Sequence, residues 1–270
     1  SLLMLTYIRK AQEHLCEAVG GALFHRPLML ALVNSVNVEE ADLKLFFREI
    51  GRIGCGEVNP SAFGHAKSDL RAELDLEPAY LYEDTTFHFD ASLYAPLGMG
   101  DVLRYVFNAD SPGEIEVMVR PSNDKELAFK LKSSASPFAL IKIGATSDWL
   151  KTELVGYEVV KGFENESFFS HLNSEDSDIN LLMGSRSFYE GWDSNRPNVI
   201  TFINIGTGTE ARKFILQSVG RGVRIEPLPG KRKRLATLHT AREVDEQTFQ
   251  AARPYLSAVE SLLIFGTNRA

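Results

Sequence analysis

The stretch VITFINIGTGTEARKFILQSVGRGVR, residues 199–224, contains the unit from which the rest of the fold can be inferred. Its first seven residues are almost all apolar or β-branched, which is typical of a strand buried on both faces of a sheet. Glycine and threonine alternate at residues 206–209, and residues 210–220 then place apolar side chains at helical spacing. This stretch therefore predicts a strand, a short turn and a helix.

The same alternation of strand and helix continues on both sides of this unit. Three further apolar runs predict buried strands, at residues 27–33, 138–143 and 179–183. Residues 38–53 alternate apolar and charged side chains with a helical period, while residues 235–238 predict a short strand and residues 246–261 a closing helix. Strands and helices that alternate over short loops predict an α/β fold, with a parallel sheet covered by helices on both faces.

One region interrupts this alternation. From residue 54 to about 135, an acidic helical piece at residues 68–77 is separated by Gly, Pro, Ser and Asn from strand candidates at residues 114–119 and 127–131. Such irregular spacing predicts a smaller α+β insertion. We therefore expect a single domain over residues 1–270 with an insertion at about 54–135.

The expected sheet also predicts where a site should lie. Ligands of parallel sheets bind beyond the carboxyl ends of the strands. Three loops follow predicted strands, namely the loop that begins at Asn34, residues 184–193 and residues 206–209. We expect these loops to share one edge of the sheet, and we expect the functional site at that edge.

Charge is distributed unevenly along the chain. The net charge is −7, which argues against general affinity for nucleic acid over the whole surface. Residues 211–234, however, carry eight basic side chains and one acidic side chain, Glu226, so this segment has a charge of +7 and the remainder −14. The asymmetry predicts that a polyanion, either phosphate groups or a nucleic-acid backbone, binds near the segment. For residues 231–234 alone, a solvated basic loop explains the charge equally well.

Cysteine usage and hydropathy limit the possible classes of protein. Cys16 and Cys55 have no metal-ligand spacing with the six histidines, so no metal site is predicted, and we expect two free thiols. No apolar run approaches the roughly 20 residues that a membrane span needs, and the N-terminus does not resemble a signal peptide. We therefore expect a cytoplasmic protein without a membrane partner.

Two arginines at the end of the 199–224 stretch have the spacing of an anion site. Arg221 and Arg224 are three residues apart, so a helix or helix-like turn points both guanidinium groups the same way. Guanidinium groups remain charged and can stabilise negative charge on a phosphoryl group that is being transferred. Gly220 and Gly222 flank Arg221 and would allow a ligand or a neighbouring lobe to approach closely. A surface helix with ordinary salt-bridged arginines is the alternative interpretation.

The order of these segments carries a resemblance to a known family. GSRSFYEGWD at residues 184–193 precedes the strand, and QSVGRGVR at residues 217–224 ends the helix after it. This order resembles motifs V and VI of superfamily 2 helicases and translocases. The wording FYEGWDSNRPNV followed by QSVGRGVR is most similar to the Res subunits of type III restriction enzymes. The resemblance is sharp over residues 179–226 and weaker at residues 27–53, which resemble motif IV.

The resemblance implies a RecA-like fold and an ATP-driven DNA motor. In that family two RecA-like lobes close around ATP, and this chain is similar to the second, C-terminal lobe. The chain contains neither G-x-x-x-x-G-K-[ST] nor an Asp-Glu box, so ATP and Mg²⁺ would be held mainly by an N-terminal RecA-like lobe of the same protein. Double-stranded DNA and a methyltransferase (Mod) subunit are the other partners that the resemblance implies.

The resemblance also implies a role for nine residues. Two match the motif VI arginines that reach the γ-phosphate, Arg221 and Arg224. Three match positions that line the nucleotide cleft, Gly191, Asp193 and Gln217. Four match positions that contact the nucleic-acid strand, Ser185, Arg186, Asn34 and Ser35.

Two other functions remain open from the sequence. One is a nucleic-acid-binding module that keeps the fold but is silent as an ATPase. The other is the motor lobe of a repair or RNA helicase, because motifs V and VI are shared across these classes. Residues 206–209 suggest a phosphate-binding loop, but they lack the lysine and are interpreted as a plain strand-to-helix turn. On every interpretation, we expect this chain alone neither to hydrolyse ATP nor to cut DNA.

Overall fold

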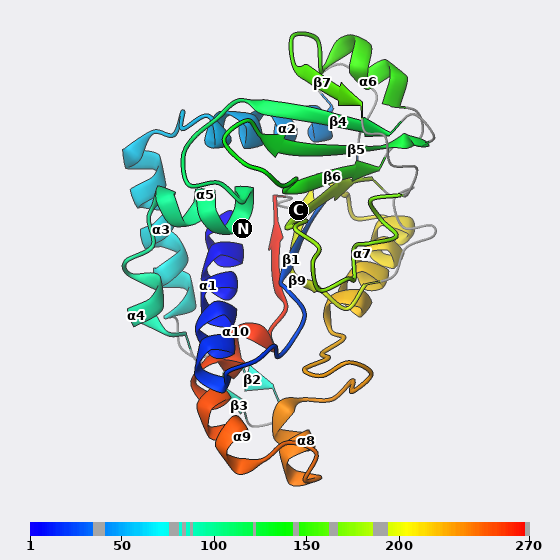
Figure 1. The fold of residues 1–270 in the computed structure, drawn as a ribbon. Coiled ribbons are helices and arrows are strands. Elements are labelled where there is room, and N and C mark those ends of the chain that lie inside the picture. The colour runs from blue at the N-terminus through cyan, green and yellow to red at the C-terminus, as the bar shows by residue number, and fades with distance from the viewer. Residues whose placement is uncertain are drawn as a thin grey trace.

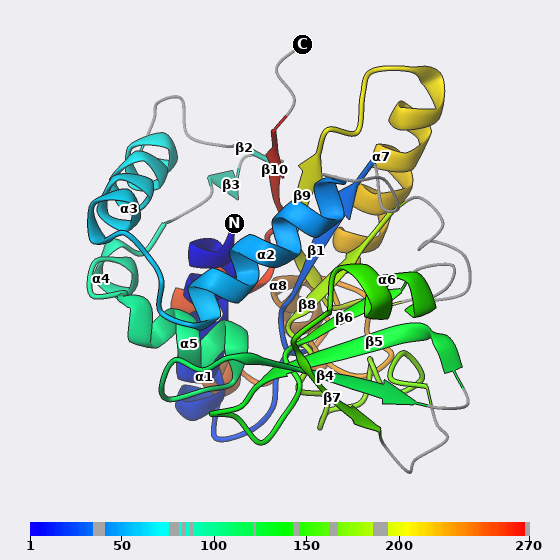
Figure 2. The ribbon, with the colours of Figure 1, turned by 90° about the horizontal axis from the view of Figure 1, so that it is seen from above.

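A computed structural model describes residues 1–34, 41–75, 81–82, 85–86, 89–120, 123–142, 146–161, 167–185 and 194–267. The strands of its main sheet are β1 (Leu28–Val33), β4 (Ile115–Arg120), β5 (Asn123–Leu131), β6 (Ala139–Lys142), β7 (Glu158–Lys161), β8 (Leu181–Gly184), β9 (Pro197–Ile203) and β10 (Leu263–Gly266). These eight strands lie in the order β10-β9-β1-β8-β6-β5-β4-β7 (Figure 1 and Figure 2). A separate two-stranded sheet pairs β2 (Leu81–Tyr82) with β3 (Thr85–Thr86).

The main sheet is mixed but mostly parallel. Its neighbouring strands pair in parallel except for the two pairs that include β5, so β5 runs opposite to the other seven strands. The fold is therefore α/β, as predicted, and it is consistent with a RecA-like arrangement. β4 and β5 come from the region predicted to be inserted, yet they pair within the main sheet.

Helices surround this sheet. They are α1 (Leu2–Val19), α2 (Asp42–Gly54), α3 (Pro60–Leu74), α4 (Ala91–Tyr94), α5 (Met99–Phe107), α6 (Thr146–Thr152), α7 (Thr209–Gly222), α8 (Leu235–Thr240), α9 (Glu246–Ala252) and α10 (Leu256–Val259), with a 3₁₀ helix at Arg253–Tyr255. No helix within the described ranges has both the length and the apolar character needed to cross a bilayer.

Helices cover both faces of the sheet because its strands are apolar on both sides. On one face, Met29, Ala31 and Val33 of β1 join a core cluster with residues of α1, α2, α5 and α6. In Figure 2, α2 crosses in front of β1 on this face. On the other face, alternate residues of β1 such as Leu30 pack in a second core cluster with Phe214 of α7. All six residues of β1 are buried, as expected for a strand covered on both faces.

The C-terminal part of the chain differs from the prediction. Residues 235–238, predicted as a strand, begin α8, because Leu235 and Leu238 lie on one side of a helical turn and are buried against α1 and α9 in a third core cluster. The closing helix predicted at residues 246–261 is divided into α9, the 3₁₀ helix and α10. Pro254 lies at this division, where a residue without an amide hydrogen disfavours continuous helix.

Candidate functional site

The carboxyl ends of three neighbouring strands form one edge of the sheet. β1 pairs in parallel with both β8 and β9, and Leu32 is in register with Gly184 on one side and with Phe202 on the other. Asn34 follows β1 and is exposed, while Ser185 follows β8 and is partly exposed. The prediction that these loops share one edge is therefore confirmed for their described residues.

Four of the nine predicted site residues lie outside the described residues, namely Ser35, Arg186, Gly191 and Asp193. Their roles remain predictions. The described residue that follows Asp193 is Ser194, which is buried and accepts a hydrogen bond at Oγ from the backbone N–H of Arg196 at 3.1 Å. The described residues that lead into β9 therefore include two buried side chains, Ser194 and Arg196.

The turn from β9 to α7 is hydrogen-bonded to the start of α2 and to the residue that follows β10. Asn204 and Gly206 both have positive φ, 52° and 83°, which permits a tight change of direction. The Nδ2 of Asn204 donates to Asp42 Oδ1 at 2.7 Å, and its backbone N–H donates to Thr267 Oγ1 at 3.1 Å. Residues 206–209 thus form the plain strand-to-helix turn that was predicted. Sequence reasoning gave Asn204 no role, although it is the one amide in an otherwise apolar run.

Arg221 and Arg224 lie at the far end of α7. The backbone N–H of Arg224 donates to the carbonyl of Arg221 at 3.3 Å, so the helix-like turn predicted from their spacing is present. Both arginines are partly exposed, and Gln217, one turn earlier, is exposed. Arg224 lines a small pocket together with His25, which precedes β1, and Asn195, which precedes β9. The arginine end of α7 therefore lies at the amino edge of the strands.

The predicted site residues consequently fall at two opposite edges. Asn34 and Ser185 follow strands, whereas Arg224 lies among residues that precede strands. A helix of this length spans about 20 Å, which is the expected separation between the two groups. The described site residues therefore do not all gather at the carboxyl edge, because α7 runs back across the sheet before it reaches the arginines.

Acidic side chains surround the pocket beside Arg224. Glu226 accepts hydrogen bonds from Asn195 Nδ2 and from the backbone N–H of Gly230, the latter at 2.6 Å, and its Oε2 lies 3.7 Å from His25 Nε2. Glu260 also lines the pocket, whose volume of about 20 Å³ is room for one water molecule. A triphosphate does not fit this space, and the two carboxylates would repel it.

Packing within the chain explains why residue 222 is a glycine. A Cβ atom built on Gly222 would overlap the side chain of Leu262, whereas a Cβ on Gly220 would meet nothing within 4 Å. The close approach expected at Gly222 is therefore made by Leu262 of the same chain. No ligand is needed to explain that glycine.

This packing predicts different effects for the two glycines. Gly222→Ala should lower the free energy of unfolding by about 1–3 kcal/mol, the usual cost of overpacking, because Leu262 must move. Gly220→Ala is the matched control in the same helix and should raise stability by up to about 1 kcal/mol, since alanine favours helix. Urea denaturation of both variants measures the two effects. Equal effects at the two positions would contradict the packing argument.

The basic segment at residues 231–234 is largely paired within the chain. Lys231 forms an ion pair with Glu243, Arg232 lies 3.6 Å from Glu226, and Arg234 lies 3.0 Å from Glu260. Burial raises the pKa of Glu260, against the opposing effects of the Leu235 backbone N–H and of Arg234. These pairs favour a structural explanation of this charge over a nucleic-acid contact.

Arg196 is a central residue that sequence reasoning missed. Its side chain is almost fully buried, with 2% exposed. It donates to the carbonyls of Arg26 at 2.8 Å and Ile179 at 2.6 Å, and also to the carbonyl of Leu172 and to Ser177 Oγ. Burial lowers the pKa of Arg196 to about 9. The sequence held no signal for this role, because an arginine in a polar turn is normally exposed.

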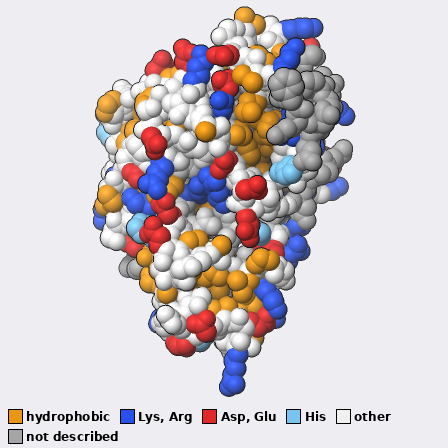
Figure 3. All heavy atoms as spheres, viewed as in Figure 1, with side chains coloured by type: hydrophobic (Ala, Val, Ile, Leu, Met, Phe, Trp, Pro, Cys, Tyr) orange, Lys and Arg blue, Asp and Glu red, His pale blue; other side chains and the backbone are white. Residues whose placement is uncertain are grey.

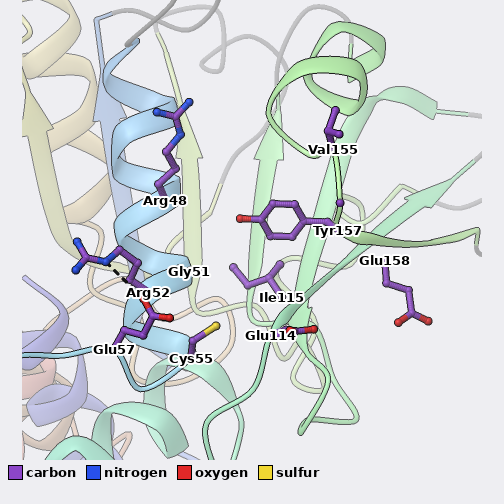
Figure 4. Close-up of a pocket in the computed structure, with 11 residues that line it drawn as sticks. Arg48, Gly51, Arg52, Cys55, Glu57, Glu114, Ile115, Val155, Tyr157 and Glu158 are labelled. Atoms are coloured by element: carbon purple, nitrogen blue, oxygen red, sulfur yellow. Dashed lines mark ion pairs between the residues drawn. The ribbon is translucent and has the colours of Figure 1, made fainter.

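A larger cavity of about 470 Å³ lies apart from the predicted site residues, at the amino ends of β4 and β7. Figure 4 shows it between the end of α2 and the starts of β4 and β7, with Arg52, Cys55 and Tyr157 among its lining side chains. Its charged groups are already paired, since Arg52 lies 3.0 Å from Glu49, and Glu114 lies 2.9 Å from Lys132. None of the described predicted site residues lines this cavity.

Across the described ranges, no three His, Cys, Asp or Glu side chains gather as they would around a metal ion. Comparison of the chain with models of known protein families, with curated proteins and with solved structures found no match.

Proposed function

We propose that this chain is the C-terminal motor lobe of an ATP-dependent DNA helicase or translocase, the Res subunit of a type III restriction enzyme. The observation that carries the proposal is the order of the two segments, GSRSFYEGWD at residues 184–193 and QSVGRGVR at residues 217–224, on either side of one strand. A mostly parallel sheet with helices on both faces supports it, because a RecA-like lobe has such a sheet.

In this proposal the arginines act on ATP that is held elsewhere. Arg221 and Arg224 would stabilise the negative charge that develops on the transferred phosphoryl group. The partial exposure of Arg224 after α7 supports this role, because a guanidinium group must reach a neighbouring surface, whereas Nη1 of Arg221 is buried in this chain. The small pocket beside Arg224 is consistent with ATP and Mg²⁺ being held mainly by an N-terminal lobe. Gly191, Asp193 and Gln217 would complete the nucleotide side of the cleft.

The opposite edge would contact DNA. Asn34 and Ser185 are accessible there, and hydroxyl and amide side chains are common donors to phosphate oxygens. Ser35 and Arg186, their sequence neighbours, are proposed for the same contact. A separation of about 20 Å between this edge and the arginines would let one lobe touch DNA and ATP at once. Closure of the lobes could then couple hydrolysis to stepping.

Phosphate release by the full-length protein, with and without double-stranded DNA, tests this proposal. We expect hydrolysis that DNA stimulates, because both ligands contact the same lobe. Tight DNA binding without any hydrolysis would instead identify a nucleic-acid-binding module that is silent as an ATPase. Stimulation by RNA but not by DNA would identify an RNA helicase.

A further inference from the structure

Two basic side chains that are not part of the proposed site lie at the carboxyl ends of strands. β4 and β6 both pair antiparallel with β5, so they run parallel to each other and to β8. Arg120 ends β4 and Lys142 ends β6. Both therefore lie at the same edge of the sheet as Ser185, further along toward β7.

Each of these cations lies over an aromatic ring. The Arg120 guanidinium carbon is 3.8 Å from the centre of the Phe168 ring, and Lys142 Nζ is 5.2 Å from the centre of the Phe169 ring. Both rings are partly exposed and also pack on the second core cluster. Figure 3 shows hydrophobic side chains gathered over β4, β5 and β6 on this face. We call Arg120, Lys142, Phe168 and Phe169 the aromatic–basic patch.

A buried carboxylate fixes the aromatic–basic patch. Glu126 of β5 is only 4% exposed, and it accepts hydrogen bonds from Ser167 Oγ at 2.6 Å and from the Phe168 backbone N–H at 3.0 Å. A buried carboxylate is costly unless such bonds compensate it. Its two bonds hold the start of the 167–180 segment against the sheet, so the two rings are positioned before any ligand arrives.

Cations that lie over aromatic rings match the chemistry of a single nucleic-acid strand. Unpaired bases stack on aromatic rings and on guanidinium planes, while Lys and Arg meet the phosphates. A base-paired duplex hides the flat faces of its bases and gains little from such rings.

We propose that the aromatic–basic patch binds a single-stranded segment of nucleic acid and extends the track that begins at Asn34 and Ser185. The inference rests on the proposed function for the presence of nucleic acid at this edge. Binding at the patch itself requires no ATP.

Salt dependence of binding tests the charged half of the patch. The probe is a fluorescein-labelled oligothymidylate, titrated with the 270-residue chain at several KCl concentrations and followed by anisotropy. Arg120→Gln combined with Lys142→Gln should make the slope of log K against log salt shallower by about 1.4, since each single-strand phosphate contact contributes about 0.7. Arg242→Gln combined with Arg253→Gln removes the same charge from exposed positions near α8 and α9, and should leave the slope unchanged.

Aromatic substitutions test the stacking half independently. Phe168→Leu and Phe169→Leu keep an apolar side chain on the core, so thermal unfolding should confirm that both variants fold. Each should weaken binding about fivefold or more at every salt concentration without changing the slope, because stacking is not ionic. Binding of a duplex of the same length should change less than twofold.

Three outcomes would overturn the inference. These are no measurable binding by the unsubstituted chain, slopes that match between the two double variants, and wild-type affinity in both leucine variants. Any of these outcomes would mean that the aromatic–basic patch only covers the second core cluster and binds no nucleic acid. The proposed motor function has a separate test. It would be refuted if the full-length protein showed no DNA-stimulated ATP hydrolysis, which the anisotropy assay does not measure.

Discussion

We expect ATP hydrolysis by the full-length protein to fall about 10³-fold when Arg221 or Arg224 is replaced by alanine. That is the lower end of the range for arginines that stabilise a phosphoryl-transfer transition state. The affinity for ATP should change far less, because charge on the transferring group is greatest in the transition state. Initial rates of phosphate release, together with ATP titrations, separate the two effects.

Two further variants make this result interpretable. Arg221→Lys keeps the charge but loses the planar fork, so it should recover only a small part of the rate. Arg212→Ala removes an exposed arginine from the first turns of the same helix and should leave the rate within about twofold of wild type. Losses of less than about threefold at both Arg221 and Arg224 would identify them as ordinary surface arginines.

The second large effect concerns stability. Arg196→Met should lower the free energy of unfolding by more than about 3 kcal/mol, because three carbonyls and one hydroxyl lose a charged donor in a buried site. Such a loss is a large part of the 5–15 kcal/mol typical of a domain. Urea denaturation provides the measurement, and Arg253→Met, at an exposed position, should stay within about 0.5 kcal/mol of wild type.

A milder substitution covers the case in which Arg196→Met does not fold. Arg196→Lys keeps the positive charge but has fewer donors and no planar fork, so it should lie between wild type and the methionine variant. A loss below about 1 kcal/mol in both variants would contradict the structural role given to Arg196.

The strands that the sequence predicts most directly are those with a continuous apolar run, although the candidates at residues 114–119 and 127–131 also correspond to β4 and β5. β1 and β9 are covered on both faces, and both-face burial leaves a run that is visible in the sequence. α8 and β10 are only six and four residues long, too short to display a period. The sequence of residues 235–238 therefore predicts a strand, although the tertiary packing of Leu235 and Leu238 selects a helix.

The sequence predicts only those parts of the candidate site that depend on local structure. The turn that joins Arg221 to Arg224 is local, so their spacing was enough to predict it. The position of that turn at the opposite edge from Ser185 depends on how α7 crosses the sheet, which no local pattern reports. The contacts of Arg196 and of Glu126 join residues far apart in the sequence, and they require the strand order of the folded sheet.

In the proposed function, this chain contributes the arginines but not the phosphate cradle of an ATP site. ATP turnover by the purified 270-residue chain is the decisive measurement. The sequence has no G-x-x-x-x-G-K-[ST] loop, and the pocket beside Arg224 holds about 20 Å³. We expect phosphate release no faster than in buffer, with no change in Arg221→Ala. Turnover by the chain alone that Arg221→Ala abolishes would contradict it.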